Sequence, residues 1–258
     1  MKFAVLGPLQ VTGEDDIPIA VSQARQRALV GVLLLYSRQP VAPSRLADML
    51  WGDDPPMDWR GSLRTHVWHI RRRLPEGRLG HDSGGYCLRT RAGELDLDEF
   101  RQFATGGREA LTRGDHASAA TQLGHAVALW RDPPLADLPD TPAVTAITRR
   151  LLDERRAAED ELADTRLELG EHRSMLVELR ARAAEGDTDE RVWERLMVAL
   201  YRSGMRAAAL QTFTQARRLL ADDFGIEPGP GLRQLQQQIL RDDPALDRWH
   251  ADPGRASR

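Results

Sequence analysis

Sulfur ligands are almost absent from this sequence: Cys87 is its only cysteine in 258 residues. One cysteine cannot form a disulfide within the chain, and it cannot supply a multi-cysteine metal site. His66 and His69 lie three residues apart, and His81 follows at a short distance. No carboxylate or second cysteine joins these histidines at a recognised metal-ligand spacing. We therefore expect no metal and no cofactor.

Long apolar runs and the common enzyme motifs are also missing. No stretch approaches the roughly 20 apolar residues that span a bilayer, and the first residues, MKFAVLGPLQVTG, lack the apolar core of a signal peptide. The sequence contains no GxxxxGK[ST] phosphate loop, no GxSxG elbow and no HExxH helix. These absences predict a cytoplasmic protein that is not an enzyme and does not associate with membranes.

Lysine is nearly absent, and the charge is unevenly distributed. Lys2 is the only lysine, so arginine supplies almost all positive charge. Residues 1–92 hold 13 basic and 9 acidic residues, a net charge of +4, whereas the remainder holds 23 and 30, a net charge of -7. This pattern predicts an N-terminal module that meets a polyanion and a second part with another role. The length also favours two domains over one.

The spacing of apolar residues changes several times along the first 92 residues. In chain order, the pattern predicts β-strands at 1–11 and 17–21, helices at 22–40, 44–51 and 57–74, and a β-hairpin at 78–90. Ser44 is the expected N-cap of the second helix. Gly84 and Gly85 allow the tight turn of the hairpin. A small antiparallel sheet, three helices and a hairpin have the layout of a winged helix-turn-helix domain.

The third predicted helix has one apolar face and one cationic face. At 100° per residue, the buried stripe is Leu63, Val67, Ile70 and Leu74. The opposite face holds Thr65, Trp68, His69 and Arg72, flanked by Arg64 and Arg71 on one side and by Ser62, His66 and Arg73 on the other. A B-DNA major groove, about 12 Å wide, admits one helix, and arginine matches guanine O6 and N7. Arginines at the sides would contact phosphates.

Two alternatives remain open for this helix. An arginine-rich helix face is often only a solvated surface, but the hairpin that follows carries further arginines, Arg78, Arg89 and Arg91. This context favours DNA binding. Trp68 fits two positions equally well, one facing DNA and one buried beneath the hairpin.

Two groups of motifs resemble a known family. The segment SRLADMLWGDDPPMDWRGSLRTHVWHIRRRLPEGRL, followed by DSGGYCLRT, resembles the OmpR-type winged-helix domain of the SARP family, the antibiotic-pathway transcriptional activators of actinobacteria. ELDLDEF at 94–100, the segment 110–138 and the segment 216–240 resemble that family's bacterial transcriptional activation domain. Together these similarities cover about residues 1–244.

The resemblance implies a winged-helix DNA-binding domain at 1–93 and an activation domain at 94–244. The short polar composition of the chain's end predicts a disordered tail at 245–258. The resemblance also implies that the third helix is the recognition helix and that the hairpin, including Tyr86, is a wing that enters the minor groove. The predicted DNA contacts are Ser62, Arg64, Thr65, His66, Trp68, His69, Arg71, Arg72 and Arg73 on the helix, and Arg78, Gly84, Gly85 and Arg89 on the wing. Trp68 departs from the family pattern, where small or polar residues are more familiar.

The second part of the chain has a helical repeat pattern. Gly114, Gly170 and Gly204 each precede an apolar residue by nine positions, namely Leu123, Leu179 and Phe213. The last two glycines are 34 residues apart, which is the period of a tetratricopeptide repeat. Such helix pairs stack into a curved array that binds peptides or proteins. The predicted fold class is therefore mainly α, with a winged helix followed by an all-α tetratricopeptide-like domain.

These patterns support one leading function and one rival. The first is a nucleoid-associated activator that binds double-stranded promoter DNA, and the family resemblance implies that its sites are direct repeats near the -35 element. The family resemblance adds RNA polymerase holoenzyme as a partner and a homodimer or side-by-side oligomer on DNA. The rival is a tetratricopeptide-type adaptor whose winged helix binds protein and reads no specific DNA. The net charge of +4 on residues 1–92 favours the activator, because an adaptor has no need for it.

Overall fold

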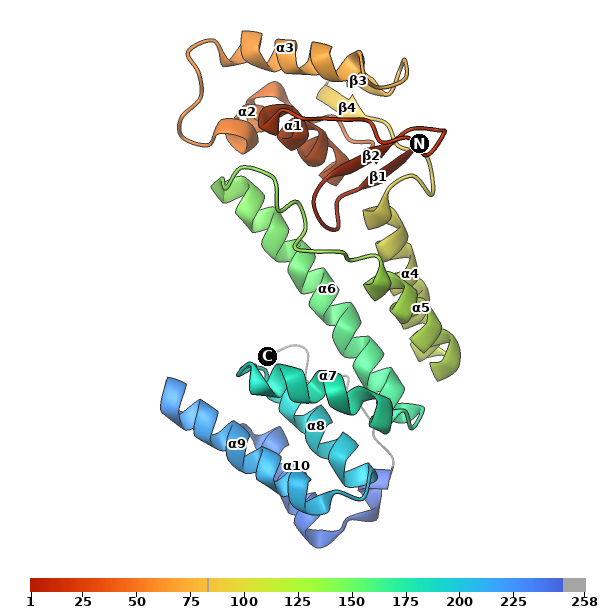
Figure 1. Cartoon of the computed structure of the whole chain (residues 1–258), viewed down its shortest axis with the longest axis vertical. Coiled ribbons are helices and arrows are strands. Elements are labelled where there is room, and N and C mark those ends of the chain that lie inside the picture. The colour runs from red at the N-terminus through yellow and green to blue at the C-terminus, as the bar shows by residue number, and fades with distance from the viewer. Residues whose placement is uncertain (83, 248–258) are drawn as a thin grey trace. The chain divides into compact units, whose positions relative to one another are not determined.

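The computed structural model describes residues 1–82 and 84–247 (Figure 1). The chain forms two compact units. One contains residues 1–108 and 122–159, and the other contains residues 109–121 and the chain from residue 160. The boundaries between these two units fall inside helices and do not test the predicted domain bounds of 1–93 and 94–244. Those bounds stay a prediction.

The N-terminal half of the first unit contains two small sheets and three helices. Its elements are β1 (Lys2–Ala4), β2 (Gln10–Thr12), α1 (Ala24–Leu35), α2 (Pro43–Trp51), α3 (Trp59–Arg71), β3 (Leu79–Asp82) and β4 (Gly85–Leu88). Strands β1 and β2 pair antiparallel, and so do β3 and β4. This order confirms the predicted winged-helix layout.

Two local expectations were wrong. The segment 17–21 forms no strand; it makes only an isolated bridge between Thr12 and Pro18, because a proline has no N–H with which to extend a ladder. Ser44 is not the N-cap of α2. Ala42 holds that position and Pro43 is the first helical residue, where its fixed φ and missing N–H cost nothing.

The core of this half is built around α1. Every residue from 28 to 34 is buried, so α1 is enclosed on all sides rather than along one face. The predicted stripe is also buried, with at most 6% of any of its residues exposed: Leu63, Val67 and Ile70 lie on α3, and Leu74 follows it, because the helix ends at Arg71 and not at the predicted residue 74. The predicted inward face of α3 is therefore confirmed, and its other residues are left for the surface.

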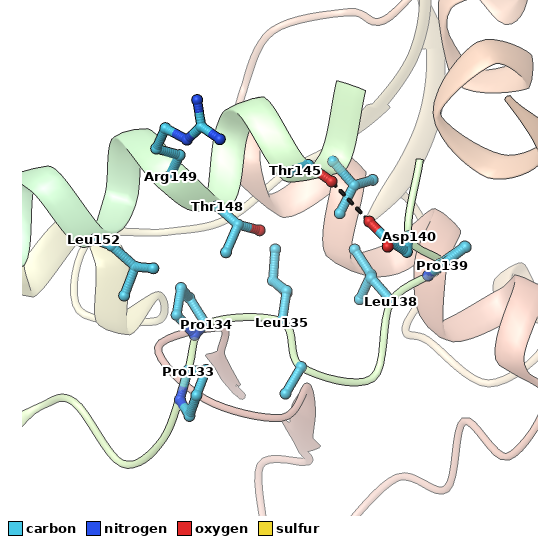
Figure 2. A pocket seen from close by; sticks show the side chains of 12 residues that line it. Pro133, Pro134, Leu135, Leu138, Pro139, Asp140, Thr145, Thr148, Arg149 and Leu152 are labelled. Atoms are coloured by element: carbon cyan, nitrogen blue, oxygen red, sulfur yellow. Dashed lines mark hydrogen bonds between the residues drawn. The ribbon is translucent and has the colours of Figure 1, made fainter. Parts of the chain in front are cut away.

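A loop at 131–141 is fastened to the same core. Asp137 pairs with Arg27 of α1 and accepts a hydrogen bond from the Leu9 backbone N–H. Thr141 donates to the Met49 carbonyl of α2 at 3.2 Å. The loop and the first turns of α6 (Pro142–Glu168) line a pocket of about 370 Å³. Figure 2 shows the side chains that line it. This loop therefore belongs to the winged-helix unit.

The remaining helices are α4 (Asp96–Thr112), α5 (His116–Ala128), α7 (His172–Ala184), α8 (Glu190–Arg202), α9 (Arg206–Phe224) and α10 (Pro230–Arg241). Gly114, Gly170 and Gly204 lie at the turns before α5, α7 and α9, with φ of 73°, 77° and 78°. The apolar residue nine positions after each glycine is buried. These observations confirm the predicted repeat frame and the mainly helical fold class.

The helical fold continues past the predicted end at 244. Residues Pro244–Asp247 form a 3-10 turn, and Leu246 is buried in the core of the second unit. The expected tail therefore begins no earlier than residue 248, and residues 248–258 lie outside the described part. None of the described helices is both long enough and apolar enough to cross a membrane.

Candidate nucleic-acid interface

The start of α3 is fixed by a side-chain cap. The Asp58 carboxylate accepts a hydrogen bond from the Gly61 backbone N–H at 2.8 Å. This bond satisfies one of the donors that every helix leaves free at its N-terminus. The helix consequently begins at Trp59, close to the predicted start, and the positions of its side chains follow from that register.

The outward face of α3 carries the predicted polar and cationic residues. Arg64, Thr65 and residues 71–73 are exposed. Trp68 is 51% exposed, so it is not part of the core. Its ring lies 4.8 Å from the guanidinium carbon of Arg72 and 4.8 Å from the His69 ring, measured to the Trp68 ring centre. The face therefore combines positive charge with an exposed aromatic surface.

The arginines of α3 divide into anchored and unanchored groups. Arg71 Nε donates to the Leu79 carbonyl of β3 at 3.0 Å, and Arg73 Nη1 donates to Gln26 Oε1 of α1 at 2.8 Å. Arg64 and Arg72 have no hydrogen-bond or ion-pair partner among the described residues. A guanidinium without a protein partner keeps all five of its donors for a ligand.

Three of the predicted contacts are half-buried instead of fully exposed, namely Ser62, His66 and His69. The His66 ring lies 6.3 Å from the Trp51 ring of α2. Burial lowers the pKa of His66, and the charges of His69 and Arg25 lower it further. The lowered pKa favours the neutral imidazole, and the ring faces the body of the domain more than the outside.

The hairpin is attached to the segment before α2. Tyr86 and Val41 exchange two backbone hydrogen bonds, of 2.8 and 3.0 Å. Gly85 is buried at this junction with φ of +137°, and a Cβ there would lie 2.0 Å from the Val41 carbonyl oxygen. Gly85 therefore serves close backbone approach, whereas Gly84 is exposed at the turn.

Arg78 does not lie on the exposed surface that the sequence suggested. Only 7% of it is exposed, and its guanidinium makes two 2.6 Å hydrogen bonds with Glu94. Its partner lies 16 residues later, outside the hairpin, which is why the hairpin sequence alone placed Arg78 with the wing contacts. Arg89 is exposed and pairs with Asp82 at 2.9 Å. Of the two predicted wing arginines, Arg89 alone reaches the surface.

The Arg78–Glu94 pair makes stability depend on pH. The hydrogen bonds from Arg78 lower the pKa of Glu94, so the pair stabilises the fold fully above about pH 5 and loses this contribution as pH falls below the ordinary Glu value.

We expect Glu94→Gln to lower the free energy of unfolding by about 3 kcal/mol at pH 7, because Arg78 stays buried and charged. Hydrogen exchange of the 79–88 amides would measure this. The loss should shrink toward pH 3; an equal loss at both pH values would contradict it.

One candidate was missed by the sequence analysis. Arg60 lies one turn before Arg64 on the same flank of α3 and is exposed, with its guanidinium carbon 4.5 Å from the Trp59 ring centre. The four-residue spacing from Arg64 is the signal that would have found it. Among the described residues, no three His, Cys, Asp or Glu side chains come together in a way that would hold a metal ion.

Comparison with known proteins agrees with this architecture. Residues 95–240 match the family model "Bacterial transcriptional activator domain". The chain is 32% identical to the regulatory protein DnrI of Streptomyces peucetius over 262 residues, covering 96% of this chain and 95% of DnrI. The chain belongs to the SARP family.

Other SARP-family relatives are longer. The regulatory protein AfsR of Streptomyces coelicolor is 39% identical over 251 residues, covering 95% of this chain and 25% of AfsR. This chain thus spans about a quarter of AfsR. The solved structure of Mycobacterium tuberculosis EmbR in complex with a low affinity phosphopeptide superposes with a TM-score of 0.88 at 32% identity, covering 94% of this chain and 65% of the EmbR chain. The SARP fold therefore extends over nearly the whole chain.

Proposed function

We propose that this protein is a sequence-specific DNA-binding transcriptional activator and not an enzyme. In this proposal α3 lies in the major groove, and the hairpin of β3 and β4 contacts the adjacent minor groove. The outward face of α3 carries the proposal, because Arg64 and Arg72 have no hydrogen-bond or ion-pair partner within the described chain. Anchored Arg71 and Arg73 stand at its edges, where phosphate contacts would fix the position of the helix.

The wider assembly follows from the size of the module. One small winged helix reads few base pairs, so useful specificity requires two protomers side by side. We propose that a homodimer or side-by-side oligomer occupies tandem direct repeats near the -35 element of a secondary-metabolite gene cluster. The helical domain, residues 94–244, would then recruit RNA polymerase holoenzyme. The names of AfsR and DnrI, both regulatory proteins, support a role in transcription regulation. Such a protein would work in the cytoplasm, at the nucleoid.

Selection from a randomised duplex pool tests the proposal. The full chain should enrich one motif present as a direct repeat, and fluorescence anisotropy should show tight binding that random duplex does not compete away. The logarithm of the affinity should fall linearly with the logarithm of the salt concentration. Failure to enrich any motif, together with weak and sequence-independent binding, would favour the protein-binding adaptor instead.

Alanine substitution distinguishes base-reading from phosphate-binding arginines. We expect Arg64→Ala and Arg72→Ala each to cost about 1 to 3 kcal/mol on the selected motif if the side chain reads a base. A phosphate contact would instead weaken binding equally on every duplex and reduce the salt slope by about 1. Arg218→Ala removes one exposed positive charge from α9 and serves as the control. Motif affinity equal to that of Arg218→Ala would remove the residue from the interface.

A further inference from the structure

Trp68 is an unusual residue to find on the outside of α3. Its side chain is 51% exposed, whereas tryptophan is highly buried on average. Its neighbours on the helix surface are His69 and Arg72, and both contact its ring. The indole therefore occupies the middle of the outward face, between two side chains that carry N–H hydrogen-bond donors.

The contact with Arg72 has a consequence for that arginine. Trp68 and Arg72 are four residues apart, the spacing at which helix side chains meet, and the cation–π contact is 4.8 Å long. Arg72 has no other partner among the described residues, so the indole alone limits its motion. A guanidinium that is already held loses less conformational entropy when it binds. Arg64 has no such support and provides the comparison within the same helix.

The exposed part of the indole also needs an apolar counterpart on DNA. In the major groove the apolar group on the base edges is the C5-methyl group of thymine. Since the indole touches the Arg72 guanidinium, the base pair it meets must neighbour the pair that Arg72 reads. Arginine reads guanine through O6 and N7. The expected target is therefore a thymine next to a guanine.

We propose that Trp68 is a specificity-determining residue that acts as a unit with Arg72, orienting its guanidinium toward guanine and itself contacting the methyl group of the adjacent thymine. The inference rests on the proposed function, since it needs α3 in the major groove. In this proposal the exposure of Trp68 has a function, because its side chain both contacts DNA and positions Arg72.

The test uses the motif that the full chain selects. Each thymine of that motif is replaced in turn by deoxyuridine, which lacks only the methyl group. One replacement, beside a guanine, should weaken binding about fourfold, the effect of one buried methyl group, while the others change little. Trp68→Ala should lose this sensitivity and bind the motif about tenfold more weakly, because Arg72 is no longer held. Trp68→Phe retains an aromatic face and should lie between the two.

Arg64→Ala supplies the matched control. It should bind more weakly but keep the same deoxyuridine sensitivity, since Arg64 does not contact the indole. A second selection with Trp68→Ala should give a motif in which the guanine and thymine preferences are both relaxed at those two positions. A circular dichroism melt like that of the parent would show that the variant is folded, as expected for a half-exposed side chain.

The outcomes separate the two proposals. If the parent chain enriches no motif, the proposed function fails. If it enriches a motif, but every deoxyuridine duplex binds as the thymine duplex does and Trp68→Ala selects an unchanged motif, DNA reading stands and the role of Trp68 is overturned. Loss of deoxyuridine sensitivity confined to Trp68 variants would support the unit of Trp68 and Arg72.

Discussion

Gly85→Ala should detach the hairpin from the helices and weaken DNA binding together with stability. A Cβ at this position would lie 2.0 Å from the Val41 carbonyl oxygen and 2.9 Å from the Ala42 Cα. These are backbone atoms just before α2, so no side chain can rotate away to make room. We expect a loss of about 3 kcal/mol, from the positive φ and from the overlap together.

Gly77→Ala is the control for this substitution. Gly77 also has positive φ, +79°, but an added Cβ there would meet nothing within 4 Å. It should therefore cost only the conformational strain, about 1 kcal/mol. Hydrogen exchange of the 79–88 amides reports the local free energy of opening, and anisotropy on the selected duplex reports binding. If the two alanine variants opened equally and bound equally, the close approach to Val41 would not hold the hairpin.

The interface could be predicted from sequence where local periodicity decides the structure. The α3 stripe and the outward position of Arg64 follow from a 3.6-residue period, and the fold places them accordingly. The glycines at 114, 170 and 204 similarly mark turns, because residues at positive φ favour glycine. Local signals of this kind need no knowledge of distant segments.

Other features depend on partners that are distant in sequence. Arg78 belongs to a hairpin that we expected to be exposed, but its guanidinium is buried in an ion pair with Glu94. The orientation of Trp68 was undecided because a helix face near a hairpin is either covered or open, and only the placement of β3 and β4 settles which. The loop at 131–141 gives no sign in its sequence that Asp137 will meet Arg27, 110 residues earlier. Charges whose partners lie far along the chain are the hardest to assign.

Arg195 is the strongest case of this kind in the second unit. It is 1% exposed in α8, at the position between Val192 and Ala199 that helical spacing assigns to the buried face. Its Nε donates to Asp164 Oδ1 at 2.7 Å, and its Nη1 pairs with Asp160. Both carboxylates come from the last part of α6. The guanidinium therefore ties α8 to that part of α6 within the helical core.

Arg195→Met should be the most damaging single substitution in this unit. It keeps most of the side-chain volume but leaves two carboxylates near one another without their buried cation, which should cost about 3 to 5 kcal/mol. Hydrogen exchange of α8 amides measures the loss. Arg191→Met is the matched control, since Arg191 contacts Asp160 at 3.8 Å from an exposed position and should cost under about 0.5 kcal/mol.

The triple change Arg195→Met with Asp160→Asn and Asp164→Asn should recover much of the stability, because no charge is left buried without a partner. If the triple variant opened as readily as Arg195→Met alone, packing of the arginine stem rather than charge pairing would hold α6 to α8.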